Sequence, residues 1–175
     1  MEATFSLARE ALASDLDHYI TLESFYILSR CDRVWQTCDG VWLHEQLVQF
    51  VTSGCDSDHQ SVLMALKVIT NLAYHLGPKL EQNYMNHCDK IGSFFETQFS
   101  RADFFVKYLF LRILYQGGAN SGKFRAWLGE QAAQILKISQ LVLDEYTHEQ
   151  EFCFETLRCR WLDASFLGSF QLMTG

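Results

Sequence analysis

One glycine-rich stretch resembles a loop that binds phosphates. Gly117 and Gly122 frame a G-x-x-x-x-G-K pattern that ends in Lys123, and such loops hold phosphates with backbone amides and the lysine. Further along, Asp144 follows an apolar run, as the Mg²⁺-binding acid of nucleotide hydrolases does. Phe124 stands where a serine or threonine would bind the metal. These residues keep a nucleotide-binding protein open as one alternative function.

The elements around this stretch favour a different interpretation. A phosphate loop follows a β-strand, whereas residues 103–116 have the pattern of a helix that Asp103 caps. Only twenty residues separate Lys123 from Asp144, which leaves room for a helix and little else. A parallel sheet needs several strands, and no further strand pattern is found. The glycine-rich stretch is therefore interpreted as a loop between helices.

The chain offers weak candidates for metal chemistry. His44-Glu45 begins like the H-E-x-x-H zinc helix, but Val48 replaces the second histidine. The six cysteines form no C-x-x-C pair and follow no export signal, which favours reduced thiols packed as small apolar groups. We therefore expect no catalytic residue, no metal and no cofactor.

A second set of polar residues recurs at helical spacing. Lys67 and Asn71 are four residues apart, as are Arg112 and Gln116, so each pair projects from one helix face. A side-chain amide both donates and accepts hydrogen bonds, which suits a peptide backbone, and the basic groups suit acidic side chains. The candidate partner-binding residues are Lys67, Asn71, Tyr74, Arg112, Tyr115, Gln116 and Arg158. An ordinary solvated helix face is the alternative interpretation.

Helical periodicity dominates the chain and predicts an all-α fold. Asp39 and Asp103 can cap helices, while Gly77-Pro78 and Gly117-Gly118 can end them. The expected helices cover 4–14, 16–31, 40–53, 58–76, 79–98, 103–116, 123–142 and 148–166.

Three of these units share a repeated pattern. An apolar residue followed by Lys or Arg stands eleven residues before a glycine, with offsets of 45 and 46 residues between units: Leu66-Lys67 with Gly77, Leu111-Arg112 with Gly122, and Leu157-Arg158 with Gly168. Stacked helical repeats of about 40–47 residues produce such a period. We expect one all-helical domain over residues 1–175, with repeats over 57–168 and an atypical capping unit over 1–54.

Residues 65–73, with Asn71 before a Leu-Ala pair, resemble the third helix of an armadillo repeat. The resemblance to the armadillo/HEAT family implies a short right-handed α-solenoid of three to four repeats, whose groove binds a peptide or a partner helix. Asn71 corresponds to Gln116 and then to Leu162, so the row of amides ends there. Lys67 and Arg112 stand where the family usually has tryptophan, unlike a nuclear-localisation-signal receptor.

Composition narrows the function classes. Hydrophobic residues make up 49% and charged residues 20% of the chain, which excludes disorder as the default state. The net charge of −7 disfavours nucleic-acid binding, yet residues 61–140 hold nine bases and five acids. That basic middle suits an acidic partner segment or charge pairing within the fold. The apolar run 104–115 is too short for a membrane span and contains Lys107 and Arg112.

Taken together, these observations predict an intracellular scaffold or adaptor, in the cytoplasm or the nucleus, without membrane or nucleic-acid contact. It would act as a non-catalytic protein-interaction module. The aromatic pairs Phe94-Phe95 and Phe104-Phe105 leave open a homodimer and, as a further alternative, a helical oligomerisation domain.

Overall fold

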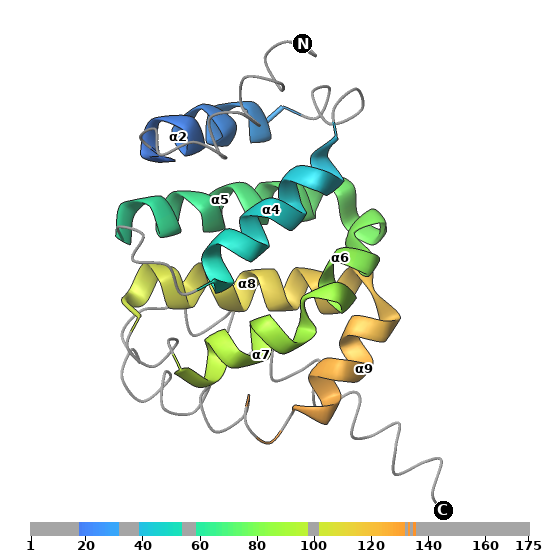
Figure 1. The fold of residues 1–175 in the computed structure, drawn as a ribbon. Helices are drawn as coiled ribbons and strands as arrows, with labels where there is room; N and C mark the ends of the chain where they lie inside the picture. The colour runs from blue at the N-terminus through green and yellow to red at the C-terminus, as the bar shows by residue number, and fades with distance from the viewer. Residues whose placement is uncertain are drawn as a thin grey trace, which may run out of the picture.

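The computed structural model describes residues 18–31, 39–53, 59–97, 102–131, 133 and 135, and among them it contains helices and no strand (Figure 1). The all-α prediction is confirmed. The helices are α2 (His18–Ser29), α4 (Gly40–Thr52), α5 (His59–Leu76), α6 (Glu81–Asn86), α7 (Cys88–Thr97), α8 (Phe104–Asn120) and α9 (Gly122–Glu130), with a 3₁₀ turn, η1 (Gly77–Leu80). The helices expected over 4–14 and 148–166, with Asp144 and Arg158, lie outside the described residues.

Side-chain caps fix where three helices begin. The Asp39 carboxylate accepts a hydrogen bond from the Trp42 backbone N–H at 3.0 Å, and Asp103 accepts one from the Val106 N–H at 2.9 Å. Both caps were expected from the sequence. The third cap was not: the Ser121 hydroxyl accepts from the Phe124 N–H at 3.0 Å and begins α9. Each cap satisfies a backbone donor that has no partner within its own helix.

The end of α5 follows the expected signal, whereas two other boundaries differ. Gly77 has a φ of +48°, which favours glycine, and α5 stops at Leu76. The single helix expected over 79–98 is instead three pieces, η1, α6 and α7, with a break at His87.

The helix expected to stop at Gly117-Gly118 continues to Asn120, so the predicted inter-helix loop is wrong. A Cβ added at Gly117 would lie 2.8 Å from ring atoms of Phe124. The glycine therefore permits α9 to pack closely on α8, and only Ser121 separates the two helices.

The helices form two layers around α5. In Figure 1, α2, α5 and α8 lie side by side in one layer, while α4 crosses in front of α5 and α7 follows α4 in the same layer. Contacts join α5 to α2, α4 and α8, and they join α9 to α6 and α8. The position of α5 explains its burial, since ten of its eighteen residues are buried.

Aromatic and aliphatic side chains fill the space between the layers. Phe94 packs on Phe110 with ring centroids 4.6 Å apart, and Tyr84 stacks on Phe124 at 4.8 Å. By contrast, Phe105 is 59% exposed, so one ring of the Phe104-Phe105 pair lies off the core, as expected for neighbouring helix positions. Within the described part of the chain, no helix has the length and apolarity needed to cross a bilayer.

Candidate functional site

The helices α5 and α8 run parallel and in register. At their N-terminal ends, His59 of α5 forms an ion pair with Asp103, the capping residue of α8. At their C-terminal ends, the Asn120 side chain lies 3.4 Å from the position of a Cβ built on Gly77. The contacting residues are 44 positions apart in the sequence at one end and 43 at the other. Because these two offsets are nearly equal, the helices stay in step along their length, and equivalent positions lie next to each other.

This register produces a common outward face, which we call the ladder face. Its residues are the ones on α5 and α8 that are not fully buried and that recur at three- and four-residue spacing: Leu63, Lys67, Asn71 and Tyr74 on α5, and Phe105, Tyr108, Arg112 and Gln116 on α8. Lys67 and Arg112 are 45 residues apart, as are Asn71 and Gln116, so the predicted pairs occupy equivalent positions on neighbouring helices.

The helix α2 extends the ladder face on the other side of α5. Asn71 Nδ2 donates a hydrogen bond to the Ser29 hydroxyl at 2.8 Å, and the Lys67 ammonium lies 5.8 Å from the centre of the Tyr26 ring. Because Tyr26 precedes Ser29 as Lys67 precedes Asn71, α2 and α5 are also parallel. A polar row therefore runs from Ser29 through Asn71 to the position of Gln116.

The remaining predicted residues differ in what they contact. Arg112 donates to the Tyr108 hydroxyl at 3.2 Å, one turn earlier on α8. Gln116 has a buried side-chain oxygen, Oε1, that has no hydrogen-bond partner within the described residues. Tyr74 is 76% exposed, whereas Tyr115 is half-buried. The sequence analysis did not identify Tyr26 and Ser29, because no repeat signal marks them.

The glycine-rich stretch has a structural role. Gly117 and Gly118 are helical, and the Ser121 N–H donates to the Gly117 carbonyl at 2.9 Å. Arg125 donates to the carbonyl of Gly118 at 2.8 Å, which satisfies an acceptor at the end of α8. A phosphate cradle needs unpaired amides in a loop, and the helical backbone from Gly117 to Asn120 does not present that loop.

Lys123 is likewise engaged within the fold. Its ammonium lies 3.4 Å from Glu81 Oε1, and the Ser121 hydroxyl donates to Glu81 Oε2 at 2.8 Å. These contacts, led by the Ser121 hydrogen bond, lower the pKa of the Glu81 carboxyl. The carboxylate joins α6 to the N-terminus of α9, where negative charge is stabilising.

A second polar cluster lies between α4 and the α6–α7 segment. His44 and Tyr84 are fully buried, and their rings meet edge to face with centroids 5.1 Å apart. Burial is the main cause that lowers the pKa of His44 to about 3, with the neighbouring His87 adding to it. Burial raises the pKa of the Tyr84 hydroxyl and, to about 11, that of the Cys88 thiol. At pH 7 the histidine is therefore neutral, and the phenol and the thiol, whose ordinary pKa values already lie above 7, are neutral as well.

Neither the arrangement of potential metal ligands nor the comparison with known proteins assigns a metal site or a family to the described part of the chain. Among the described residues, no group of three histidine, cysteine, aspartate or glutamate side chains is placed to hold a metal ion. Comparison with protein-family models, curated proteins and solved structures finds no match for this chain. The armadillo/HEAT resemblance therefore stays a prediction.

Proposed function

We propose that the ladder face binds an extended, acidic segment of a partner protein, and that the chain acts as a non-catalytic interaction module. The observation that carries this proposal is the alignment of two amide–base pairs, Lys67 with Asn71 and Arg112 with Gln116, on parallel neighbouring helices.

The spacing of the pairs suits an extended chain that crosses the helices. Packed helix axes lie about 8–10 Å apart, and an extended peptide advances about 3.3 Å per residue. Equivalent side chains on α5 and α8 would thus meet positions about three residues apart in the partner. Lys67 and Arg112 would each pair with an aspartate or glutamate at that interval. Asn71 keeps a second N–H and a carbonyl oxygen beyond its bond to Ser29.

We further propose that the two layers are part of a right-handed solenoid of three to four armadillo/HEAT-like repeats. In this interpretation, α4 with α5 and α7 with α8 are successive units, and α9 begins the next. Neighbouring units would share one core, which holds the ladder face rigid before the partner arrives. A preorganised surface lowers the entropy lost on binding.

Selection from a displayed library of random peptides tests the proposal. The wild-type chain should enrich sequences with Asp or Glu about three residues apart. The variant Lys67→Glu/Arg112→Glu should lose them, while Lys79→Glu/Lys90→Glu makes the same charge change at exposed positions on η1 and α7 and should retain them. Enrichment of the same acidic peptides by all three proteins would refute the assignment of the ladder face.

A further inference from the structure

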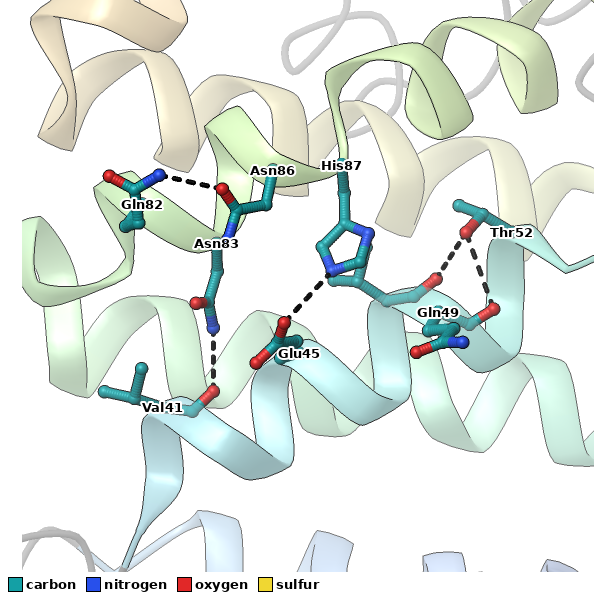
Figure 2. A network of polar contacts seen from close by, with 9 residues as sticks. Val41, Glu45, Gln49, Thr52, Gln82, Asn83, Asn86 and His87 are labelled. Atoms are coloured by element: carbon teal, nitrogen blue, oxygen red, sulfur yellow. Dashed lines mark hydrogen bonds and ion pairs between the residues drawn. The ribbon is translucent and has the colours of Figure 1, made fainter.

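The α6–α7 segment meets α4 through a hydrogen bond from Asn83 and a contact between His87 and Glu45 (Figure 2). Asn83 Nδ2 donates to the Val41 carbonyl at 2.7 Å, and His87 Nε2 lies 3.8 Å from Glu45 Oε1. Beside them, the Tyr84 ring packs edge-on against His44. We call the residues His44, Glu45, Tyr84 and His87 the latch.

Within the described residues, His44 has no hydrogen-bond partner for a positive charge, and the Glu45 carboxylate lies 3.8 Å from His87, beyond hydrogen-bond distance. Neither ring nitrogen of His44 has a hydrogen-bond partner in the described part of the chain, and the same holds for the nitrogens of His87 and the Tyr84 hydroxyl. An imidazolium has two N–H donors, and both would need acceptors. A buried charge without such partners strongly favours a conformation that exposes it to water.

The charged groups around the latch act mainly on His87. Lys90 of α7 disfavours the charged form of His87 and Glu45 of α4 favours it, and burial is the largest cause that lowers the pKa of His87. His87 in turn disfavours a charge on His44. On the side of α9, the latch meets the uncharged ring of Phe124, which stacks on Tyr84.

The other elements packed on α4 direct their charged groups elsewhere. On α5, His59 pairs with Asp103 and Lys67 lies over Tyr26. On η1, Lys79 is exposed. Among the described residues, the charged or titratable group that acts on the pKa of His44 is therefore His87.

The contact between α4 and α5 would survive such protonation. The buried side chains of α4 other than His44 are apolar: Leu43, Leu47, Val48 and Val51. They gain no charge on acidification, so the hydrophobic contribution of the α4–α5 contact is unchanged. Acid should therefore act locally on the α6–α7 side of α4.

We propose that the latch is an acid-sensitive device, closed at neutral pH, that releases the α6–α7 segment from α4 when His44 and His87 take up protons. Acid should open the latch, and not close it, because both histidines are harder to protonate in the closed state than in water. A group with a lowered pKa stabilises the closed state fully above its ordinary value of 6.5 and loses this contribution as the pH falls below it. The inference does not depend on the proposed binding function.

Hydrogen exchange of the full chain, followed by mass spectrometry from pH 7.5 to pH 4.5 and corrected for intrinsic rates, tests the proposal. The opening constant of residues 81–97 should rise about tenfold per pH unit below pH 6.5 for the proton on His44, and further for the proton on His87. Residues 59–76 should stay better protected than residues 81–97 at every pH, because α5 would exchange through global unfolding and not through opening of the latch. The substitution His44→Phe should remove the part of this pH dependence that comes from protonation of His44. The substitution His87→Gln should remove the part that comes from protonation of His87.

His75→Gln is the matched control, because His75 lies half-buried on α5 and is not among the groups that shift the pKa of His44 or His87, and it should reproduce the wild-type dependence. Where His44→Phe does not fold, His44→Leu and His87→Gln give the same comparison. The proposal is overturned if residues 81–97 and 59–76 open with the same free energy at every pH, or if the His44 and His87 variants keep the wild-type pH dependence.

Discussion

The substitution Gly117→Ala tests why α8 contains glycine near its end. In a helix interior, alanine in place of glycine stabilises a protein by about 1 kcal/mol. At this position the new methyl carbon would lie 2.8 Å from two ring atoms of Phe124 and 3.2 Å from Tyr84. Both rings are buried and cannot move freely. Overpacking of this kind costs about 1–3 kcal/mol, so the net effect ranges from neutral to a loss of about 2 kcal/mol.

Gly92→Ala provides the control in another helix interior. Its methyl carbon would lie 3.5 Å from the Trp127 ring, an ordinary contact, so the full gain of about 1 kcal/mol is expected. The two variants should therefore differ by about 1–3 kcal/mol in urea unfolding followed by circular dichroism. For a chain of 175 residues, each kcal/mol shifts the melting temperature by about 2–4 °C. Equal stability of both variants would refute the close packing of α8 on Phe124.

Three further substitutions test contacts described above. Ser121→Ala should lower the free energy of unfolding by about 1 kcal/mol, because it removes the cap of α9 and the hydrogen bond to Glu81; a loss under about 0.3 kcal/mol in chemical denaturation would contradict this cap. A double-mutant cycle with Asn71→Ala and Ser29→Ala should give a coupling energy of about 0.5–1.5 kcal/mol, and additive losses would exclude the α2–α5 hydrogen bond. Between pH 7 and pH 5, the His44→Phe variant should become about 2 kcal/mol more stable relative to the wild type. The reason is that the wild type loses about 1.4 kcal/mol per pH unit below pH 6.5, because the pKa of His44 in the folded state is about 3. Parallel pH profiles of the two proteins in thermal melts would contradict this prediction.

The sequence predicted much of the fold because strong local signals mark it. Asp39 and Asp103 each precede an apolar periodic segment, and both are the caps of their helices. Gly77-Pro78 combines a residue that accepts positive φ with one that cannot continue a helix. Where a glycine has a tertiary role instead, the same reasoning failed. Gly117 was interpreted as a stop, although its lack of a side chain serves the contact with Phe124.

The candidate site was only partly predictable. The recurrence of Lys67 and Arg112 predicts that they share a face, and they lie at equivalent positions because the parallel packing of α5 and α8 preserves a sequence offset. The partners on α2 could not be found this way, because the spacing between α2 and α5 follows no repeat in the chain. The burial of His44 could not be predicted from the sequence either. A histidine on an apolar helix face fits either the surface or the core, and only the ring of Tyr84 decides between them.

The dissociation constant of one selected acidic peptide tests the central claim most directly. Isothermal titration at pH 7.5 would compare the wild type with Lys67→Glu/Arg112→Glu and with Lys79→Glu/Lys90→Glu. We expect the first double variant to bind at least about tenfold more weakly, because two ion pairs become repulsive contacts. The second should stay within about twofold of the wild type. Equal weakening in both double variants, or an unchanged constant in the first, would contradict binding at the ladder face.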